Sequence, residues 1–197
     1  TSMSDERVSK LFRVDPKAAA KARQKKAVRR RQDVRLRAFM AKRLQQNVIG
    51  GESAAAAAPF TPSDSGWAGV RDVIASGDRA RKLAALRHSR EAVLTEGRTA
   101  IQGILDAGML PCLIQSAMSD DEEVVLSAAC VLANMATGTQ AQTRQVYQCA
   151  PLFITFLRGS NVRLIEQSAH LLGNFAADDP ELRAHLTSEG VIPRLVE

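Results

Sequence analysis

The sequence predicts an all-α protein in which a basic N-terminal arm precedes a solenoid, a stack of helical repeats. Only 4% of its 197 residues are aromatic, with one Trp and one Tyr, whereas β-sandwiches and barrels depend on aromatic and β-branched residues. A sequence repeat runs through the second half of the chain at a spacing typical of helical solenoids. Lysine and arginine are concentrated at the N-terminus. These observations separate an arm from a folded body.

Residues 1–50 form the basic arm. They contain fifteen Lys and Arg against four Asp and Glu, a net charge of +11, whereas residues 51–197 contain twelve against seventeen, a net charge of −5. Neither Pro nor Gly occurs from Lys17 to Leu44, and Ala, Lys, Arg, Gln and Leu dominate there, so one long exposed helix is predicted. A basic arm joined to an acidic body can bind an acidic partner, a nucleic acid or its own body. Charge alone leaves these three alternatives open.

Residues 51–66 are predicted to be a flexible linker. The stretch GGESAAAAAPFTPSDSG, from Gly50 to Gly66, is rich in Gly, Ala, Pro and Ser and has no hydrophobic periodicity. Such a composition cannot bury enough apolar surface to offset the entropy lost on ordering. The arm and the repeats are therefore predicted to be separable.

Residues 67–197 are predicted to hold about three repeats, the last of them truncated. Gly108, Cys149 and Gly190 occupy matching positions, and both spacings, 149 − 108 and 190 − 149, equal 41 residues, which suits armadillo or HEAT units of two or three helices. A less regular unit precedes them, with a helix break at 76–78. The sequence stops at VIPRLVE, just into the first helix of a new unit, which predicts a fragment of a longer protein.

Two segments inside the repeats align, and each is predicted to be a core helix. Residues 122–138 match residues 162–178, and apolar or small residues follow the i, i+3, i+4, i+7 rule in both. These residues are Val125, Ala128, Ala129, Leu132 and Ala136 in the first segment and Ile165, Ser168, Ala169, Leu172 and Ala176 in the second. The carboxylates of residues 120–123 are predicted to lie at the start of the first helix, where the helix dipole stabilises them.

Several kinds of function have no support in the sequence. No stretch approaches the roughly 18 apolar residues of a membrane span and no apolar segment follows the N-terminus, so a soluble intracellular protein is predicted. Cys112, Cys130 and Cys149 form no CxxC pair and have no His at metal-ligand spacing, so we expect buried thiols and no metal site. No nucleotide-binding, zinc-protease or nucleophile motif occurs. We therefore expect no enzyme activity, no cofactor and no small-molecule ligand.

Asn134 and Asn174 are the first candidate binding residues. They follow Leu132 and Leu172 by two residues, about 200° around the helix from the packed side, so both are predicted to face away from the core. Stacked repeats would line them up along one surface, where an Asn offers two donors and an acceptor to the backbone of an extended peptide. Alternatively each Asn caps a helix end, because turn residues follow closely in both repeats. Both alternatives stay open.

Longer stretches carry a more specific resemblance. VLANMATGTQAQTRQV and EQSAHLLGNFAADDPELRAHLTSEGVIPRL resemble the second and third armadillo repeats of the importin α family, and RKLAALRHSREAVLTEG with ILDAGMLPCL resembles the first. The resemblance covers about residues 69–197. It implies an armadillo-repeat, right-handed superhelical solenoid that binds nuclear localisation signals, which are extended Lys/Arg-rich peptides. The matching peptide-binding positions in this sequence are Asn134, Asn174, Gly138, Thr139 and Asp178.

Two positions depart from the family pattern. Four residues before each Asn, where the family has Trp, this chain has Cys130 and His170. Those Trp rings hold the aliphatic stems of Lys and Arg and add cation–π attraction, about 0.5–2 kcal/mol per contact. Two functions are therefore predicted as alternatives. One is a nuclear import adaptor that binds basic signals, and the other is an armadillo scaffold that has lost classical signal recognition.

The arm resembles the importin-β-binding segment of the same family over residues 7–47. RVSKLFR and AVRRRQDVRLRAFMAKRLQQN are similar to its basic motifs. The resemblance implies binding to importin β through Lys10, Arg13, Arg29, Arg30, Arg31, Arg35, Arg37, Lys42 and Arg43. It also implies that the arm can fold back over the groove of the repeats and that the protein occurs in the cytoplasm and the nucleus. Its position before three such repeats favours importin β over a nucleic acid as the partner.

Overall fold

A computed structural model describes residues 66–191 of the chain, except for the side chain of Asp178. The predicted arm and the predicted linker up to residue 65 therefore lie outside the described residues, as does the stretch 192–197. The long helix predicted from Lys17 to Leu44 and the nine basic arm residues named above stay predictions for the same reason.

All regular structure in the described residues is helical, which confirms the predicted all-α class. The helices are α3 (Gly66–Ala75), α4 (Arg79–Glu96), α5 (Arg98–Asp106), α6 (Leu110–Ser116), α7 (Glu122–Met135), α8 (Gln140–Val146), the short 3-10 helix η1 (Tyr147–Cys149), α9 (Ala150–Phe156), α10 (Val162–Asp178) and α11 (Pro180–Ser188). The predicted helix break lies between α3 and α4. The two predicted core helices are α7 and α10, and α7 ends three residues before its predicted segment does.

The long helices α4, α7 and α10 begin in the same way, with a short polar side chain at the N-cap. The cap residues are Asp78, Asp121 and Asn161, and each side chain accepts one or two hydrogen bonds from main-chain amides of the first turn. Such a cap satisfies amides that have no partner inside the helix and contributes about 1 kcal/mol. Proline occupies the first turn of α6, α9 and α11, where its missing N–H removes no helical hydrogen bond. Local sequence signals therefore account for these helix starts.

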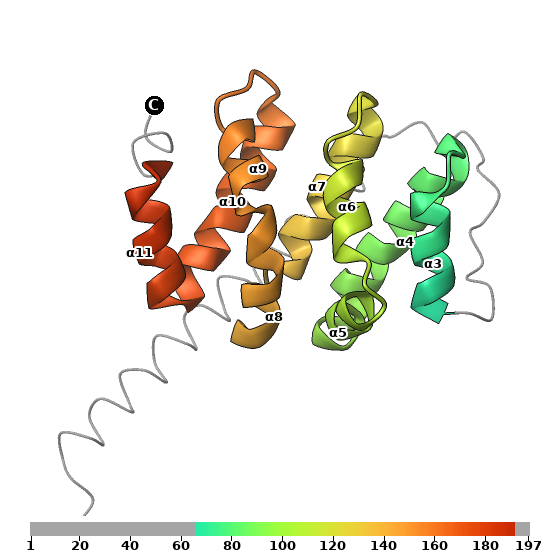
Figure 1. Ribbon diagram of the computed structural model, residues 1–197, viewed down its shortest axis with the longest axis horizontal. Helices are drawn as coiled ribbons and strands as arrows, with labels where there is room; N and C mark the ends of the chain where they lie inside the picture. The colour runs from blue at the N-terminus through green and yellow to red at the C-terminus, as the bar shows by residue number, and fades with distance from the viewer. Residues whose placement is uncertain (1–65, 192–197) are drawn as a thin grey trace, which may run out of the picture. The chain divides into compact units, whose positions relative to one another are not determined.

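The helices of successive units pack in a repeating pattern. α4, α7 and α10 follow one another in a row, with α4 against α7 and α7 against α10 (Figure 1). α3 packs on α4, α6 on α7 and α9 on α10, while α8 contacts both α5 and α7. The N-caps Asp121 and Asn161 are 40 residues apart, so each position of α7 has an equivalent 40 residues later in α10.

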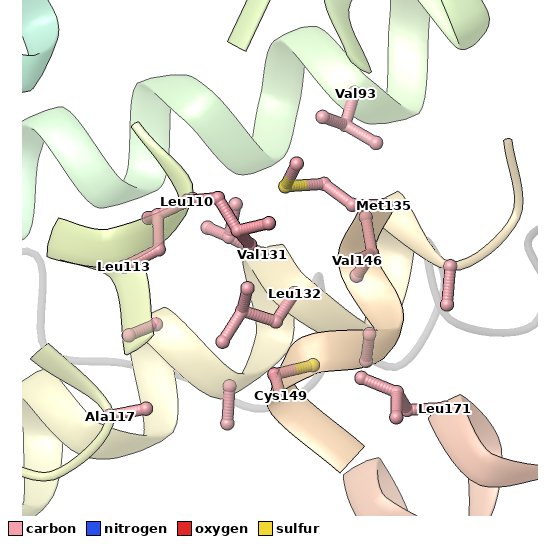
Figure 2. Packing of buried hydrophobic residues seen from close by; sticks show 14 of the residues in the cluster. Val93, Leu110, Leu113, Ala117, Val131, Leu132, Met135, Val146, Cys149 and Leu171 are labelled. Atoms are coloured by element: carbon pink, nitrogen blue, oxygen red, sulfur yellow. The ribbon is translucent and has the colours of Figure 1, made fainter. Parts of the chain in front are cut away.

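An apolar core runs between these helices. Figure 2 shows Val131, Leu132 and Met135 of α7 with Leu113 of α6 on one side and Leu171 of α10 on the other. The largest fully buried side chains are Phe153, Phe175, Ile74, Leu86, Ile101, Ile104, Met109, Leu113, Leu132, Met135, Leu171 and Leu172. Full burial of one such side chain contributes about 1.5–3 kcal/mol of transfer free energy. Because these residues come from neighbouring units, the core joins each unit to the next.

The residues that mark the sequence repeat do not all build the same turn. Gly108 and Gly190 have φ values of 66° and 68°, a region that favours glycine. Cys149, which aligns with them, instead ends η1 with φ −84°. The repeat spacing is therefore kept, although the backbone conformation at Cys149 differs from that at the two aligned glycines. α11 precedes the VIPRLVE stretch, of which only Val191 lies within the described residues, so the truncated last repeat stays a prediction.

The burial predicted for the second core helix was only partly right. Val125, Ala129 and Ala136 of α7 are buried, whereas their equivalents Ile165, Ala169 and Ala176 of α10 are half-buried. The physical reason is the position in the row. α7 has a long helix on both sides, whereas α10 has one on the α7 side alone among the described helices.

The prediction that all three cysteines are buried was wrong for two of them. Cys149 is buried, and burial raises the pKa of its thiol to about 12. Cys112 and Cys130 are half-buried. A side chain in a row of helices can lie at a helix edge, which hydrophobic periodicity along one helix does not reveal.

Candidate functional site

Equivalent positions on α7 and α10 bring four predicted binding residues together. Cys130 and His170 are 40 residues apart, as are Asn134 and Asn174, and the N-caps of the two helices have the same separation. In each helix the asparagine follows the other residue by four positions, which puts both on one helix face. α7 and α10 pack against each other, so the four residues stand at equivalent positions of neighbouring helices. We call these four residues the asparagine face.

Asn134 is the most enclosed residue of the asparagine face, with 1% of its surface exposed. The prediction that it faces away from the core was therefore wrong. α4, α6, α8 and α10 all pack against α7, and its buried residues include Val131 and Ala133 as well as the predicted apolar stripe. A helix surrounded in this way has no broad outward side.

Asn174 is half-buried and carries an unsatisfied donor. Its side-chain nitrogen Nδ2 is shielded from solvent and has no hydrogen-bond partner within residues 66–191. A buried donor without a partner costs about 1–3 kcal/mol, so this group calls for a partner such as a bound ligand. Neither asparagine is a cap, because the C-caps of α7 and α10 are Ala136 and Asp179. The capping alternative was therefore wrong.

Gly138 and Thr139 form the turn between α7 and α8. Thr139 is the N-cap of α8, and its hydroxyl accepts a hydrogen bond from the Gln142 amide at 3.3 Å while its own amide donates to Gln142 Oε1 at 2.9 Å. This reciprocal pair is a capping box. Gly138 is buried, and a Cβ atom there would lie 2.7 Å from the same Gln142 oxygen. Both residues therefore have a structural role that needs no ligand.

Gln142 extends this turn into a link between units, and sequence reasoning missed it. Its side chain is buried, and Nε2 donates to the carbonyl of Arg98 and to Gln102 Oε1, both at 3.0 Å. Both bonds tie α8 to α5. The Thr-x-x-Gln spacing is the signal that predicts the capping box. The contacts to α5 have no such signal, because they join residues 40 or more positions apart.

Cys130 and His170 are half-buried on the asparagine face. A thiol is a weak hydrogen-bond donor, whereas an imidazole can donate, accept or carry a proton near neutral pH. Neither side chain offers the flat area that a Trp presents to an aliphatic stem. Asp178, the fifth predicted binding residue, ends α10, and its side chain lies outside the described part of the structure.

Ion pairs join the N-terminal ends of α4 and α7. Arg79 contacts Asp121 at 2.5 Å and Glu123 at 2.8 Å, and Arg87 contacts Glu123 at 3.1 Å. The hydrogen bond from Arg79 is the main cause that lowers the pKa of Asp121, and the amide of Val124 adds to it. Two cations meet two anions here, so the cluster links the helices without adding net charge.

Asp179 is a second residue that sequence reasoning missed. It is the N-cap of α11 and only 1% exposed, and its carboxylate accepts hydrogen bonds from Arg144 at 2.6 Å, from Gln140 at 3.2 Å and from the Glu181 amide at 2.9 Å. Burial opposes ionisation, but these hydrogen bonds outweigh it, and the pKa of Asp179 lies below its ordinary value. An Asp directly before Pro180 is the sequence signal for such a cap.

Other kinds of site have no counterpart in residues 66–191. No cluster of three or more His, Cys, Asp or Glu side chains there could hold a metal ion. None of the helices in this range combines the length and the apolar composition needed to cross a membrane.

Comparison with known proteins identifies the repeats. Residues 101–137, from α5 to the end of α7, match the family described as Armadillo/beta-catenin-like repeat. Importin subunit alpha-6 of Arabidopsis thaliana is 30% identical over 133 residues, which cover 64% of this chain and 25% of that protein. Importin subunit alpha-9 of the same plant is 34% identical over 118 residues, which cover 58% of this chain and 22% of that protein. Importin subunit alpha of Saccharomyces cerevisiae is 35% identical over 95 residues, which cover 47% of this chain and 18% of that protein.

Solved structures with the same fold include designed armadillo proteins. The designed armadillo repeat protein YIII(Dq.V1)4CPAF, solved in complex with the peptide (KR)4, has a TM-score of 0.61 at 20% identity over 66% of this chain and 55% of that one. The designed protein YIII(Dq)4CqI has the same TM-score and coverage at 24% identity. These likenesses confirm the predicted armadillo solenoid. The matched stretches span 18–25% of the length of the curated relatives named above.

Proposed function

We propose that this chain, an armadillo-repeat protein whose repeats are similar to those of importin alpha subunits, is an adaptor for nuclear protein import. The asparagine face binds the backbone of an extended Lys/Arg-rich signal peptide, and the basic arm recruits importin β. Such an adaptor works by reversible recognition and moves between the cytoplasm and the nucleus.

One observation carries the proposal, the unsatisfied side-chain donor of Asn174, which stands at the position of α10 that the enclosed Asn134 occupies in α7. A peptide in extended conformation presents a carbonyl and an amide at every residue, and Asn can bind both. Asn174 Nδ2 is a shielded donor with no acceptor in the described part of the chain, so a peptide carbonyl would satisfy it. Repetition of the same side chain in successive units suits a ligand with a repeating backbone.

The charge of the body supports a basic ligand. Residues 51–197 carry a net charge of −5, which attracts Lys and Arg side chains and repels nucleic acids. A solved protein of the same fold binds the basic peptide (KR)4. The same charge also suits the chain's own arm, so the arm and a cargo peptide are expected to compete for the groove.

Cys130 and His170 favour a second candidate, an armadillo scaffold that binds proteins through other chemistry. Without the Trp rings of the importin α pattern, aliphatic stems of Lys and Arg lose their packing surface on both units. Such a scaffold keeps the contacts of the asparagines with a peptide backbone and selects partners that have side chains other than Lys and Arg.

Titration of a fluorescent (KR)4 peptide with the full chain tests the proposal. In the variant Asn174→Ala, we expect the affinity to fall by about fivefold, because one lost hydrogen bond contributes about 1 kcal/mol. The variant Gln148→Ala is the control, since it removes an exposed amide from η1.

Two results would contradict the adaptor proposal. One is the absence of saturable (KR)4 binding by the unmodified chain. The other is an equal affinity of the unmodified chain and the Asn174→Ala variant. Titration of the full chain with labelled duplex DNA at physiological salt, without (KR)4, tests the nucleic-acid alternative, which saturable binding through the arm would favour.

A further inference from the structure

We propose that Ser119 is a phosphorylation site for a protein kinase that recognises acidic residues after the serine it modifies. Ser119 is exposed in the loop between α6 and α7. Phosphorylation adds an anion to a cavity that also contains Lys82 of α4, so the modified loop binds that helix. The proposal does not depend on the proposed role in nuclear import, because it rests on this loop and not on the asparagine face.

The residues that follow Ser119 indicate the class of enzyme. Four acidic residues come directly after it, Asp120, Asp121, Glu122 and Glu123. Asp120 and Glu122, one and three positions after the serine, are exposed. Kinases select their substrates partly by charge pattern, and a run of carboxylates fits an enzyme whose substrate-binding surface is basic.

The hydroxyl group of Ser119 is available for the transfer. Its Oγ accepts a hydrogen bond from the Asp121 amide at 3.1 Å, and its proton makes no hydrogen bond within residues 66–191. In the reaction the O–H bond breaks, the proton goes to a base of the kinase, and Oγ forms a bond to the γ-phosphorus of a nucleoside triphosphate. The bond between that phosphorus and the β-phosphate oxygen breaks, and a nucleoside diphosphate leaves.

Lys82 supplies a positive charge beside the modified serine. Lys82 and Ser119 line the same surface cavity of about 330 Å³, together with Cys112 and Asp120 among others. Burial raises the pKa of the Cys112 thiol, and the charge of Lys82 is among the causes that lower it, so the ammonium group acts within this cavity. Lys82 forms no ion pair in the described part of the chain. A phosphoserine carries a charge of about −1.5 to −2, which attracts this ammonium group as the neutral hydroxyl does not.

The next unit provides an internal comparison. Ser160 lies 160 − 119 = 41 residues after Ser119 and is exposed in the loop between α9 and α10. No carboxylate occurs among the four residues that follow it. Lys82 stands four positions after the N-cap of α4, and the buried Val125 stands four positions after the N-cap of α7. The second loop therefore lacks both the acidic run and a lysine at the matching position.

Incubation of the full chain with an acid-directed serine kinase, ATP and Mg²⁺ tests the modification. Peptide mass mapping should find a phosphate on Ser119 and none on Ser160. Replacing both Asp120→Asn and Glu122→Gln should slow phosphorylation of Ser119 by about tenfold or more, because the kinase loses two attractive charges. A kinase that instead selects arginine before the serine is the control, and it should leave Ser119 unmodified.

The melting temperature tests the contact with Lys82. Circular dichroism measures how phosphorylation changes this temperature in the chain with Lys82 and in Lys82→Met. The change should be more favourable with Lys82, by about 1–3 °C, because the phosphate then has a cation to bind. Repulsion between the phosphate and Asp120 is present in both chains and cancels in the comparison. Arg81→Met is the matched control, since it removes an exposed cation that does not line the cavity.

Three results would overturn the proposal. The first is a Ser119 that stays without phosphate after incubation with a kinase that modifies an acidic control peptide. The second is an equal rate for the chain and its variant without the charges of Asp120 and Glu122. The third is an equal change in melting temperature with and without Lys82. None of these readouts involves binding of (KR)4 or importin β, so they are independent of the adaptor proposal.

Discussion

At the scale of single residues, Asp179 shows how one side chain can serve two units. Its carboxylate caps α11 and also binds Arg144 and Gln140 of α8. Arg144 in turn contacts Glu181 at 2.6 Å, so α8 and the first turn of α11 share one charged cluster. The cluster stabilises the junction only while the carboxylate of Asp179 is ionised.

Replacing Asp179 with Asn should therefore lower the melting temperature at neutral pH while keeping an oxygen for the N-cap. The folded-state pKa of Asp179 is lowered, so the ionised group contributes stability above the value of about 3.9 that Asp has in an unfolded chain. This contribution is lost as the pH falls through the lower folded-state pKa. The difference in melting temperature between the two proteins should shrink below about pH 4, as circular dichroism can measure.

Asp120→Asn is the control for this prediction, because it removes an exposed carboxyl from the loop before α7. It should change the melting temperature little at any pH. A difference between Asp179→Asn and the unmodified chain that grows in acid would show that the ion pair is not what Asp179 contributes.

At the same scale, Cys130 and His170 separate the two candidate functions. The double variant Cys130→Trp with His170→Trp should bind (KR)4 more tightly, by roughly 0.5–2 kcal/mol per restored cation–π contact. Fluorescence anisotropy measures the affinity. Gln148→Trp, which places an indole on η1 outside the asparagine face, should have no effect. If the unmodified chain already binds as tightly as the double variant, the scaffold candidate fails.

At the scale of elements, the turn from α7 to α8 depends on the absence of a side chain. Gly138 lies under Gln142, whose amide group is held by Thr139 on one side and by α5 on the other. Gln142 cannot swing away without breaking these hydrogen bonds. The turn therefore follows the C-terminal end of α7, beside the asparagine face, and positions α8 against α5.

Gly138→Ala should destabilise the protein by about 1–3 kcal/mol, because the added methyl group overpacks a closed site. Gly77→Ala is the matched control, since a Cβ there meets no atom within 4 Å and its φ is not positive. That control should be neutral or stabilising by up to about 1 kcal/mol. Urea unfolding measures both, and equal free energies of unfolding for the two variants would refute the role given to Gly138.

At the scale of the whole molecule, charge is divided between the two parts of the chain. Residues 1–50 carry +11 and residues 51–197 carry −5. Attraction between such parts extends over about 10 Å at moderate salt and weakens as salt rises. Salt should therefore weaken the binding of the arm to any acidic partner.

The variant Arg29→Ala with Arg30→Ala and Arg31→Ala should weaken binding to importin β by about tenfold or more, with a smaller salt dependence. The control Lys17→Ala with Lys21→Ala and Lys25→Ala removes the same charge from the same arm outside the Arg run. Calorimetric titration of the full chain at low and high salt measures both. Equal losses in the two triple variants would mean that the arm binds through net charge alone and not through the Arg run.

The sequence by itself determined the features that depend on neighbours along the chain. The helix break at 76–78, the starts of α7 and α10 and the acidic first turn of α7 all follow from caps, turn residues and a 3.6-residue period. The repeat spacing then determined the fold class, because a unit that cannot bury its apolar side alone must stack on the next one.

Only the tertiary structure decided what depends on residues far apart in sequence. Asn134 and Ala129 are buried whereas their equivalents Asn174 and Ala169 are half-buried, because burial depends on how many helices pack on each side. The contacts of Gln142 with α5 and of Asp179 with Arg144 join residues 35 to 44 positions apart. Periodicity and capping describe one helix at a time, whereas these contacts exist only once the helices of successive units have packed together.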